Sequence, residues 1–325
     1  MTILNAFARR AAIAVGATLL ASASAMAAYP DRPVTLVVTY PPGGTVDVVA
    51  RLIGPKLAEK LGKPVVIENR GGAGGMIGGA AVSKAKPDGY TLMLDASNHA
   101  QNPAIHSKMQ FDTLADFAPV SLLLRVPNVL VVTPNAPINS VADLIKAGQD
   151  KDKPMYFASA GPGSAQHLGG ELFNLLAKTH LEHVAYKGGG PAMIDVMAGQ
   201  VPVMFASMGS AWQHVKNGKL RAVAVGGSQR SATAPELPTL AEAGVPGYES
   251  YEWNAVFAPA GTPPEIIDQV SKALAEVLKD PAVATTLAGI GAETIGSTPA
   301  ELDTFRRAEI DKWKKVVTEA NLKLD

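Results

Sequence analysis

The fold class is best predicted from one segment, Val34-Thr-Leu-Val-Val-Thr-Tyr-Pro-Pro-Gly-Gly-Thr-Val-Asp-Val-Val-Ala-Arg51. Residues 34–40 form a β-branched, apolar run of strand length. The two prolines that follow end the strand because they cannot donate to a ladder, and the two glycines allow a positive φ or a close approach to a ligand. Thr45 is a suitable N-cap for a helix whose apolar residues recur at helical spacing: Val46, Val49, Ala50, Ile53, Leu57 and Leu61.

This strand, glycine loop and helix start form a candidate anion site. The N-terminus of a helix presents unpaired N–H groups and a partial positive charge, and both favour a bound anion. An ordinary turn between a strand and a helix explains the same residues equally well. The loop alone does not decide between the two interpretations.

The same architecture recurs about 120 residues later. Residues 155–159 are a predicted strand, and Ala160-Gly-Pro-Gly-Ser164 leads from it into a helix that Ser164 caps. Two such helix N-termini in one chain suggest a ligand held between two similar lobes. Valine at Gly44 or at Gly163 is then expected to abolish ligand binding and to leave the fold largely intact.

A third group of candidates follows residues 90–94, another predicted strand. Ser97, Asn98 and His99 belong to a cluster of short polar side chains at the C-terminal end of that strand. Open α/β sheets bind ligands at such ends, so these three residues are pocket candidates. A polar surface loop would have the same composition.

Two longer-range predictions concern the scaffold. Residues 119–124 and 129–133 are predicted as two separate strands. Residues 299–320 are predicted as an amphipathic helix that covers the core, because apolar side chains are spaced among charges there.

The sequence offers little that would hold a cofactor or a metal, or act as a nucleophile. The glycine-rich residues 69–79 lack the third glycine of a dinucleotide loop, no Walker motif occurs, there is no cysteine, and His180 and His183 have no third ligand nearby. Ser164 and His167 lie three residues apart outside a G-x-S-x-G turn, so a helix cap and a helix-face histidine explain them better than a catalytic pair. We expect no enzymatic activity, no cofactor and no metal. The alternative is a secreted α/β hydrolase or transferase that uses these two residues.

Residues 1–27 have the pattern of a cleaved signal peptide. Arg9-Arg10 precedes an uncharged apolar run, residues 11–21, and Ala25-Met26-Ala27 matches a signal-peptidase site. The run is shorter than the roughly 20 residues of a membrane span. Without this segment the 29 basic and 29 acidic residues become 27 and 29, and so near-neutral a chain offers nothing to nucleic acid or to an anionic membrane. We expect a mature chain that begins at Ala28 and resides in the periplasm.

A set of motifs along the whole mature chain resembles the receptors of tripartite tricarboxylate transporters, the Bug or TctC type. The motifs are Tyr40-Pro-Pro-Gly-Gly-Thr-x-Asp47, Pro64-x-x-x-Glu-Asn-Arg-x-Gly-Ala-Gly-Gly, Pro87-Asp-Gly-Tyr-Thr-Leu, Gly161-x-Gly-Ser-x-x-His-Leu and Tyr186-Lys-Gly-Gly-x-Pro. The resemblance implies an α/β fold of two lobes, a type II-like periplasmic binding protein in which each lobe is a mixed sheet flanked by helices. Residues 28–124 and 226–325 would form lobe 1, and residues 125–225 lobe 2.

Such a receptor is expected to be a monomer that captures a small organic acid, a mono- or dicarboxylate, between its lobes. It would deliver the acid to the membrane permease subunits of a tripartite transporter. With the pocket candidates above, the ligand-binding residues are expected to be Tyr40, Pro42, Gly43, Gly44, Thr45, Asp47, Ser97, Asn98, His99, Gly161, Gly163, Ser164, His167, Tyr186, Ala206 and Ser207.

One position departs from the resemblance. Family members often carry Asp in the strand that here contains Ala206. Burying an ammonium group without a partner is costly, so the missing acid favours a ligand without an amine. An amine-free organic acid is therefore expected, with dicarboxylates slightly favoured.

Overall fold

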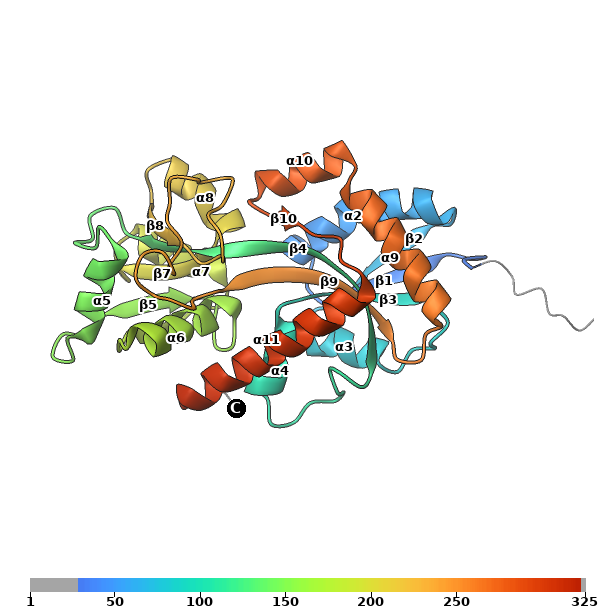
Figure 1. Ribbon diagram of the computed structural model, residues 1–325, viewed down its shortest axis with the longest axis horizontal. Helices are drawn as coiled ribbons and strands as arrows, with labels where there is room; N and C mark the ends of the chain where they lie inside the picture. The colour runs from blue at the N-terminus through green and yellow to red at the C-terminus, as the bar shows by residue number, and fades with distance from the viewer. Residues whose placement is uncertain (1–28, 323–325) are drawn as a thin grey trace, which may run out of the picture. The chain divides into compact units, whose positions relative to one another are not determined.

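The computed structural model describes residues 29–322, so the predicted signal peptide lies outside the described residues. Contacts divide the chain after Asp31, and all the elements below belong to the unit that begins at Arg32. Figure 1 shows the arrangement of these elements. Among residues 29–322 no helix is long and apolar enough to cross a membrane.

The first sheet begins with the segment quoted above. β1 (Val34–Val38) pairs in parallel with β2 (Val65–Asn69) and with β3 (Thr91–Ala96). β9 (Tyr251–Pro259) is antiparallel to β3, and the short β10 (Glu293–Thr294) is antiparallel to β4 (Phe117–Val132). The helices of this half are α2 (Thr45–Leu61), the 3₁₀ turn η1 (Ala73–Gly75), α3 (Met76–Val82), α4 (Asn98–Ile105), α9 (Pro264–Leu278) and α10 (Pro281–Gly289).

The second sheet is also mixed. β5 (Tyr156–Ser159) is parallel to β6 (Glu182–Ala185) and to β7 (Val203–Ser207), while β7 and β8 (Arg221–Val225) are antiparallel to β4. Its helices are α5 (Val141–Gln149), α6 (Ala165–Ala177), α7 (Gly189–Met197) and α8 (Met208–Lys216). The predicted α/β class, with a mixed sheet and flanking helices in each half, is confirmed.

One strand joins the two sheets. β4 (Phe117–Val132) pairs with β9 from Phe117 to Pro127 and with β7 from Asn128 to Val132. The prediction of two separate strands here was wrong. Pro127 has no N–H to donate, but it lies where β4 passes from one partner to the next, so the strand continues through it. Figure 1 shows β4 and β9 as the long strands between the two groups of elements.

Helix α11 (Pro299–Glu319) packs against both halves, as the amphipathic pattern predicted. Leu302 and Ile310 belong to the hydrophobic cluster around Trp253 and Phe257 of the first sheet. Trp313 and Val316 belong to the cluster of the second half, with Phe157 and Phe205 among its members. The helix therefore contributes to both cores.

Candidate functional site

A cleft of about 520 Å³ lies where loops of both halves meet. Figure 1 shows the strands whose ends carry these loops, β1 and β3 in one half and β5 in the other. The cleft is lined by Tyr40, Pro41, Pro42, Gly44, Thr45, Val46, Gly74, Ala96, Ser97, Asn98, Ala160, Pro162, Ser164, Ala165, Gln166, Gly188, Gly189 and Glu252.

Four helices begin at this cleft. The lining includes the cap and the first residue of α2, α4, α6 and α7. Of these described caps only Ser164 of α6 accepts a hydrogen bond from its own helix through its side chain. The first-turn N–H groups of α2, α4 and α7 are therefore not occupied by a cap side chain, and the first residue of each of these helices lines the cleft. Such a set of donors and helix dipoles suits an anion.

The cleft lining is almost free of charge. Among the described residues that line it, Glu252 is the one side chain with a formal charge, and no lysine or arginine is present. The hydroxyl groups of Tyr40, Thr45, Ser97 and Ser164 and the amides of Asn98 and Gln166 are neutral hydrogen-bonding groups. A bound anion would thus be recognised by backbone and neutral donors.

Asp47 holds the first loop in place and does not line the cleft. Its carboxylate accepts hydrogen bonds from Gly43 N at 2.9 Å, Arg51 Nε at 3.0 Å and Asn69 Nδ2 at 2.9 Å. The hydrogen bond from Arg51, and after it that from Gly43, lowers the pKa of Asp47 to about 2. Thr45 is the first helical residue of α2 and Gly44 is its cap, so the predicted capping role of Thr45 was wrong.

This carboxylate should make the stability of the protein depend on pH in the acid range. The pKa of Asp47 is lower in the folded protein than the roughly 3.9 of an unfolded chain, so its stabilising effect is present above pH 4 and is lost as the pH falls towards 2. We expect Asp47→Asn to lower the free energy of unfolding at pH 7, and the difference from wild type to shrink between pH 4 and pH 2. Urea denaturation of both proteins at several pH values measures this difference in the free energy of unfolding. A difference that stays constant down to pH 2 would contradict the assignment.

The second loop is held by Ser164 and His167. Ser164 Oγ accepts from His167 N at 3.2 Å and donates to Gly161 O at 2.7 Å, while Gly163 N donates to His167 Nδ1 at 3.0 Å. The His167 ring is buried and stacks on His183 at 3.8 Å. Its Nδ1 is thus engaged by the loop backbone and not by the Ser164 hydroxyl, an arrangement unlike a nucleophile and its base.

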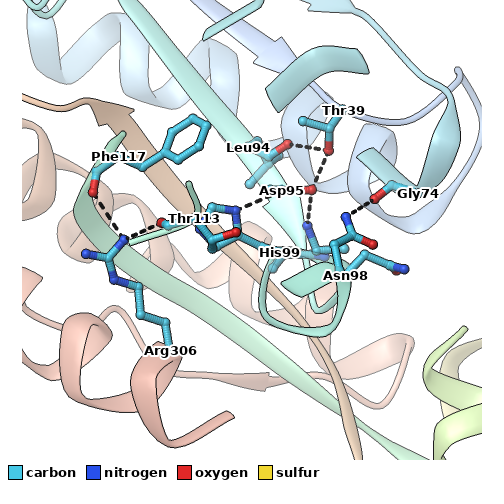
Figure 2. Close-up of polar contacts among 12 residues, drawn as sticks. Thr39, Gly74, Leu94, Asp95, Asn98, His99, Thr113, Phe117 and Arg306 are labelled. Atoms are coloured by element: carbon cyan, nitrogen blue, oxygen red, sulfur yellow. Dashed lines mark hydrogen bonds and ion pairs between the residues drawn. The ribbon is translucent and has the colours of Figure 1, made fainter. Parts of the chain in front are cut away.

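The floor of the cleft near α4 rests on a buried polar cluster. Asp95 accepts from Thr39 Oγ1 at 2.6 Å and lies 3.1 Å from His99 Nδ1 (Figure 2). His99 is buried and stacks on Phe257, so it supports the loop from beneath. Asn98 does line the cleft, and its Oδ1 accepts from Tyr40 Oη at 2.9 Å.

The structure therefore separates the expected ligand-binding residues into two groups. The cleft is lined by Tyr40, Pro42, Gly44, Thr45, Ser97, Asn98 and Ser164. Outside the lining are Gly43, Asp47, His99, Gly161, Gly163, His167, Tyr186, Ala206 and Ser207. In this second group, the Tyr186 hydroxyl donates to Asp195 at 2.7 Å, and Ala206 and Ser207 are buried in or at the end of β7.

Several lining residues were not anticipated. Gly188 and Gly189 bring the N-terminus of α7 to the cleft, and the run of three glycines before Pro191 was a usable signal for them. Gln166 follows the Ser164 cap directly. Glu252 comes from β9, far along the chain, and nothing in its local sequence indicates a site.

Comparison with known proteins identifies the family to which the chain belongs. A model described as "Tripartite tricarboxylate transporter family receptor" (TctC) matches residues 49–322. The chain belongs to this family. It is 39% identical to Protein BugT of Bordetella pertussis over 298 residues, which cover 91% of each protein.

Two solved structures, each with an organic acid, are similar to this chain. Rpa4515 of R. palustris, solved with adipate, is 38% identical with a TM-score of 0.80, covering 90% of this chain and 98% of that one. MatC (Rpa3494) of Rhodopseudomonas palustris, with bound malate, is 33% identical with a TM-score of 0.77, covering 89% and 100%. TctC-family proteins are periplasmic solute-binding receptors, and the periplasmic binding-protein fold predicted for this member is confirmed.

Proposed function

We propose that this protein is an exported periplasmic receptor that captures a small organic acid in the cleft and delivers it to the permease of a tripartite tricarboxylate transporter. The observation that supports this most strongly is the convergence of four helix N-termini, three of them without a side-chain cap, on one cleft. Membership of the TctC family and the acids bound by Rpa4515 and MatC support the same ligand class and partner.

The cleft is proposed to lie between two lobes. Lobe 1 comprises residues 28–124 and 226–325, and lobe 2 residues 125–225, with the crossings in β4 and after β8. The change of partner along β4 supports the first crossing, and the end of β8 at Val225 supports the second. The proposed ligand-binding residues are those of the expected set that line the cleft, together with the backbone at Gly188 and Gly189.

Binding of organic acids to the purified mature chain tests the proposal. A ligand at a hundredfold excess over its dissociation constant should stabilise the folded state by about 2.7 kcal/mol, and the melting temperature should rise accordingly. We expect such shifts with mono- or dicarboxylates and none with the corresponding neutral amides. The acid should be recovered unchanged. Equal shifts with acids and amides, or conversion of the acid to a product, would contradict the proposed function.

A further inference from the structure

The single formally charged side chain among the described lining residues is an acid, in a cleft otherwise suited to an anion. Glu252 lies near the start of β9, opposite Val126 of β4, and lines the cleft from the first sheet. It is partly buried.

Among the described residues that line the cleft with Glu252, none is a lysine or an arginine. Tyr40 and Glu252 both line the cleft, and burial, followed by the charges of Asp95 and Glu252, raises the pKa of the Tyr40 hydroxyl. The Tyr40 hydroxyl itself donates to Asn98, so it is already engaged. Burial raises the pKa of Glu252, and the Ser207 hydroxyl offsets only part of that effect. A charged Glu252 thus has no cationic partner among the described residues that line the cleft.

A carboxylate bound in the cleft makes the missing cationic partner of Glu252 more costly. The ligand and Glu252 would be two anions in one small cleft whose described lining contains no lysine or arginine. A ligand that also carries an N–H or O–H group pointing at Glu252 removes the conflict, because that group donates to the carboxylate. A hydrogen bond to a charged group is worth more than one between neutral groups.

We propose that Glu252 accepts a hydrogen bond from the ligand and thereby selects carboxylic acids that also carry an amino or hydroxyl group. The inference rests on the proposed function and deepens it. It also revises the expectation of an amine-free acid, which considered Ala206 of β7 and Asp47 of α2 but not Glu252. β7 and β9 both pair with β4, and the acid absent from β7 is present on β9.

Two series of matched acids test this proposal. Succinate, malate and aspartate share one carbon skeleton and differ only in carrying hydrogen, hydroxyl or ammonium at one carbon; glutarate, 2-hydroxyglutarate and glutamate form a second series. Calorimetry on wild type should give at least one hydroxy or amino acid bound about tenfold or more tightly than the plain acid of its series.

Variants of Glu252 test whether this residue causes the tighter binding of the hydroxy or amino acid. Glu252→Gln keeps an acceptor oxygen but no charge, so the preference for ammonium should fall about tenfold while that for hydroxyl is largely kept. Glu252→Ala should lose both. Glu249→Gln changes an acid three residues away, outside the cleft lining, and should keep wild-type binding. Circular dichroism confirms that each variant is folded.

Other outcomes would overturn the inference. If the plain acid binds as tightly as its hydroxy and amino relatives, Glu252 does not select by hydrogen bonding. Proton uptake with the plain acid, measured by calorimetry in two buffers, would show that Glu252 is protonated and donates to the ligand instead. If no acid binds to wild type at all, the proposed function fails and this inference fails with it.

Discussion

Replacing Gly44 with valine should weaken the binding of an organic acid at least ~100-fold, because the equivalent of two charge-assisted hydrogen bonds would be lost. Gly44 is the cap of α2 and lines the cleft. The valine methyl groups would stand between the ligand and the first-turn N–H groups of the helix, which need close approach to the anion.

The fold should tolerate this substitution. The backbone of Gly44 is extended, with φ −81° and ψ 169°, a conformation that suits a β-branched residue. A Cβ atom there would meet only Pro41 O, at 3.9 Å. We therefore expect a melting temperature close to that of wild type, measured by circular dichroism, together with lost binding by calorimetry.

Gly289→Val is a matched control. Gly289 ends α10 outside the cleft lining, and a Cβ atom there meets nothing within 4 Å. This variant should bind like wild type. Wild-type affinity in Gly44→Val would remove the N-terminus of α2 from the site.

The corresponding substitution in the second loop, Gly163→Val, cannot separate an effect on ligand binding from an effect on the fold. Gly163 has φ +71°, and a Cβ atom there would lie 2.8 Å from Ile105 Cδ1. Valine at this position would strain the backbone and displace a core side chain. In contrast to the expectation from the sequence, Gly163→Val should therefore lower the stability of the fold, and loss of binding in this variant would not identify the site.

The elements that could be predicted are those that depend on the order of residues within a short segment. Apolar runs, glycine loops and helical periodicity located the strand–loop–helix units at residues 34–51 and 155–167 and the helix α11. The continuous strand β4 was not predicted because a proline such as Pro127 usually ends or interrupts a strand. Only the change of pairing partner along the strand explains why Pro127 does not interrupt it.

The direction in which a side chain points was harder to predict than the loop that carries it. Thr45 and Asp47 lie two residues apart at the start of α2, yet Thr45 lines the cleft while Asp47 turns back to Gly43 and Arg51. Asn98 and His99 are neighbours, and only Asn98 lines the cleft. For Glu252 the position in the sequence was the difficulty. Its side chain lines the cleft, but its strand lies far along the chain from either predicted loop.

The largest loss of stability is expected when leucine replaces Arg306 of α11. This guanidinium is buried and donates to Thr113 O and Phe117 O, each at 3.1 Å (Figure 2), and pairs with Asp303. Thr113 and Phe117 are buried residues, so the substitution would leave two carbonyl groups without this donor. We expect a loss of about 3 kcal/mol in the free energy of unfolding, measured by urea denaturation at pH 7.

Arg307→Leu supplies the control within the same turn of helix. Arg307 also pairs with Asp303, at 2.8 Å, but its side chain is 54% exposed, so its loss should cost about 0–1 kcal/mol. Neither arginine lines the cleft, and acid binding by the folded fraction should be unchanged in both variants. Equally small losses in the two would mean that water replaces Arg306 at the Thr113 and Phe117 carbonyls. Weakened binding in Arg306→Leu would mean instead that the start of β4 and the cluster around His99 transmit the change to the cleft, since His99 packs edge-on against Phe117.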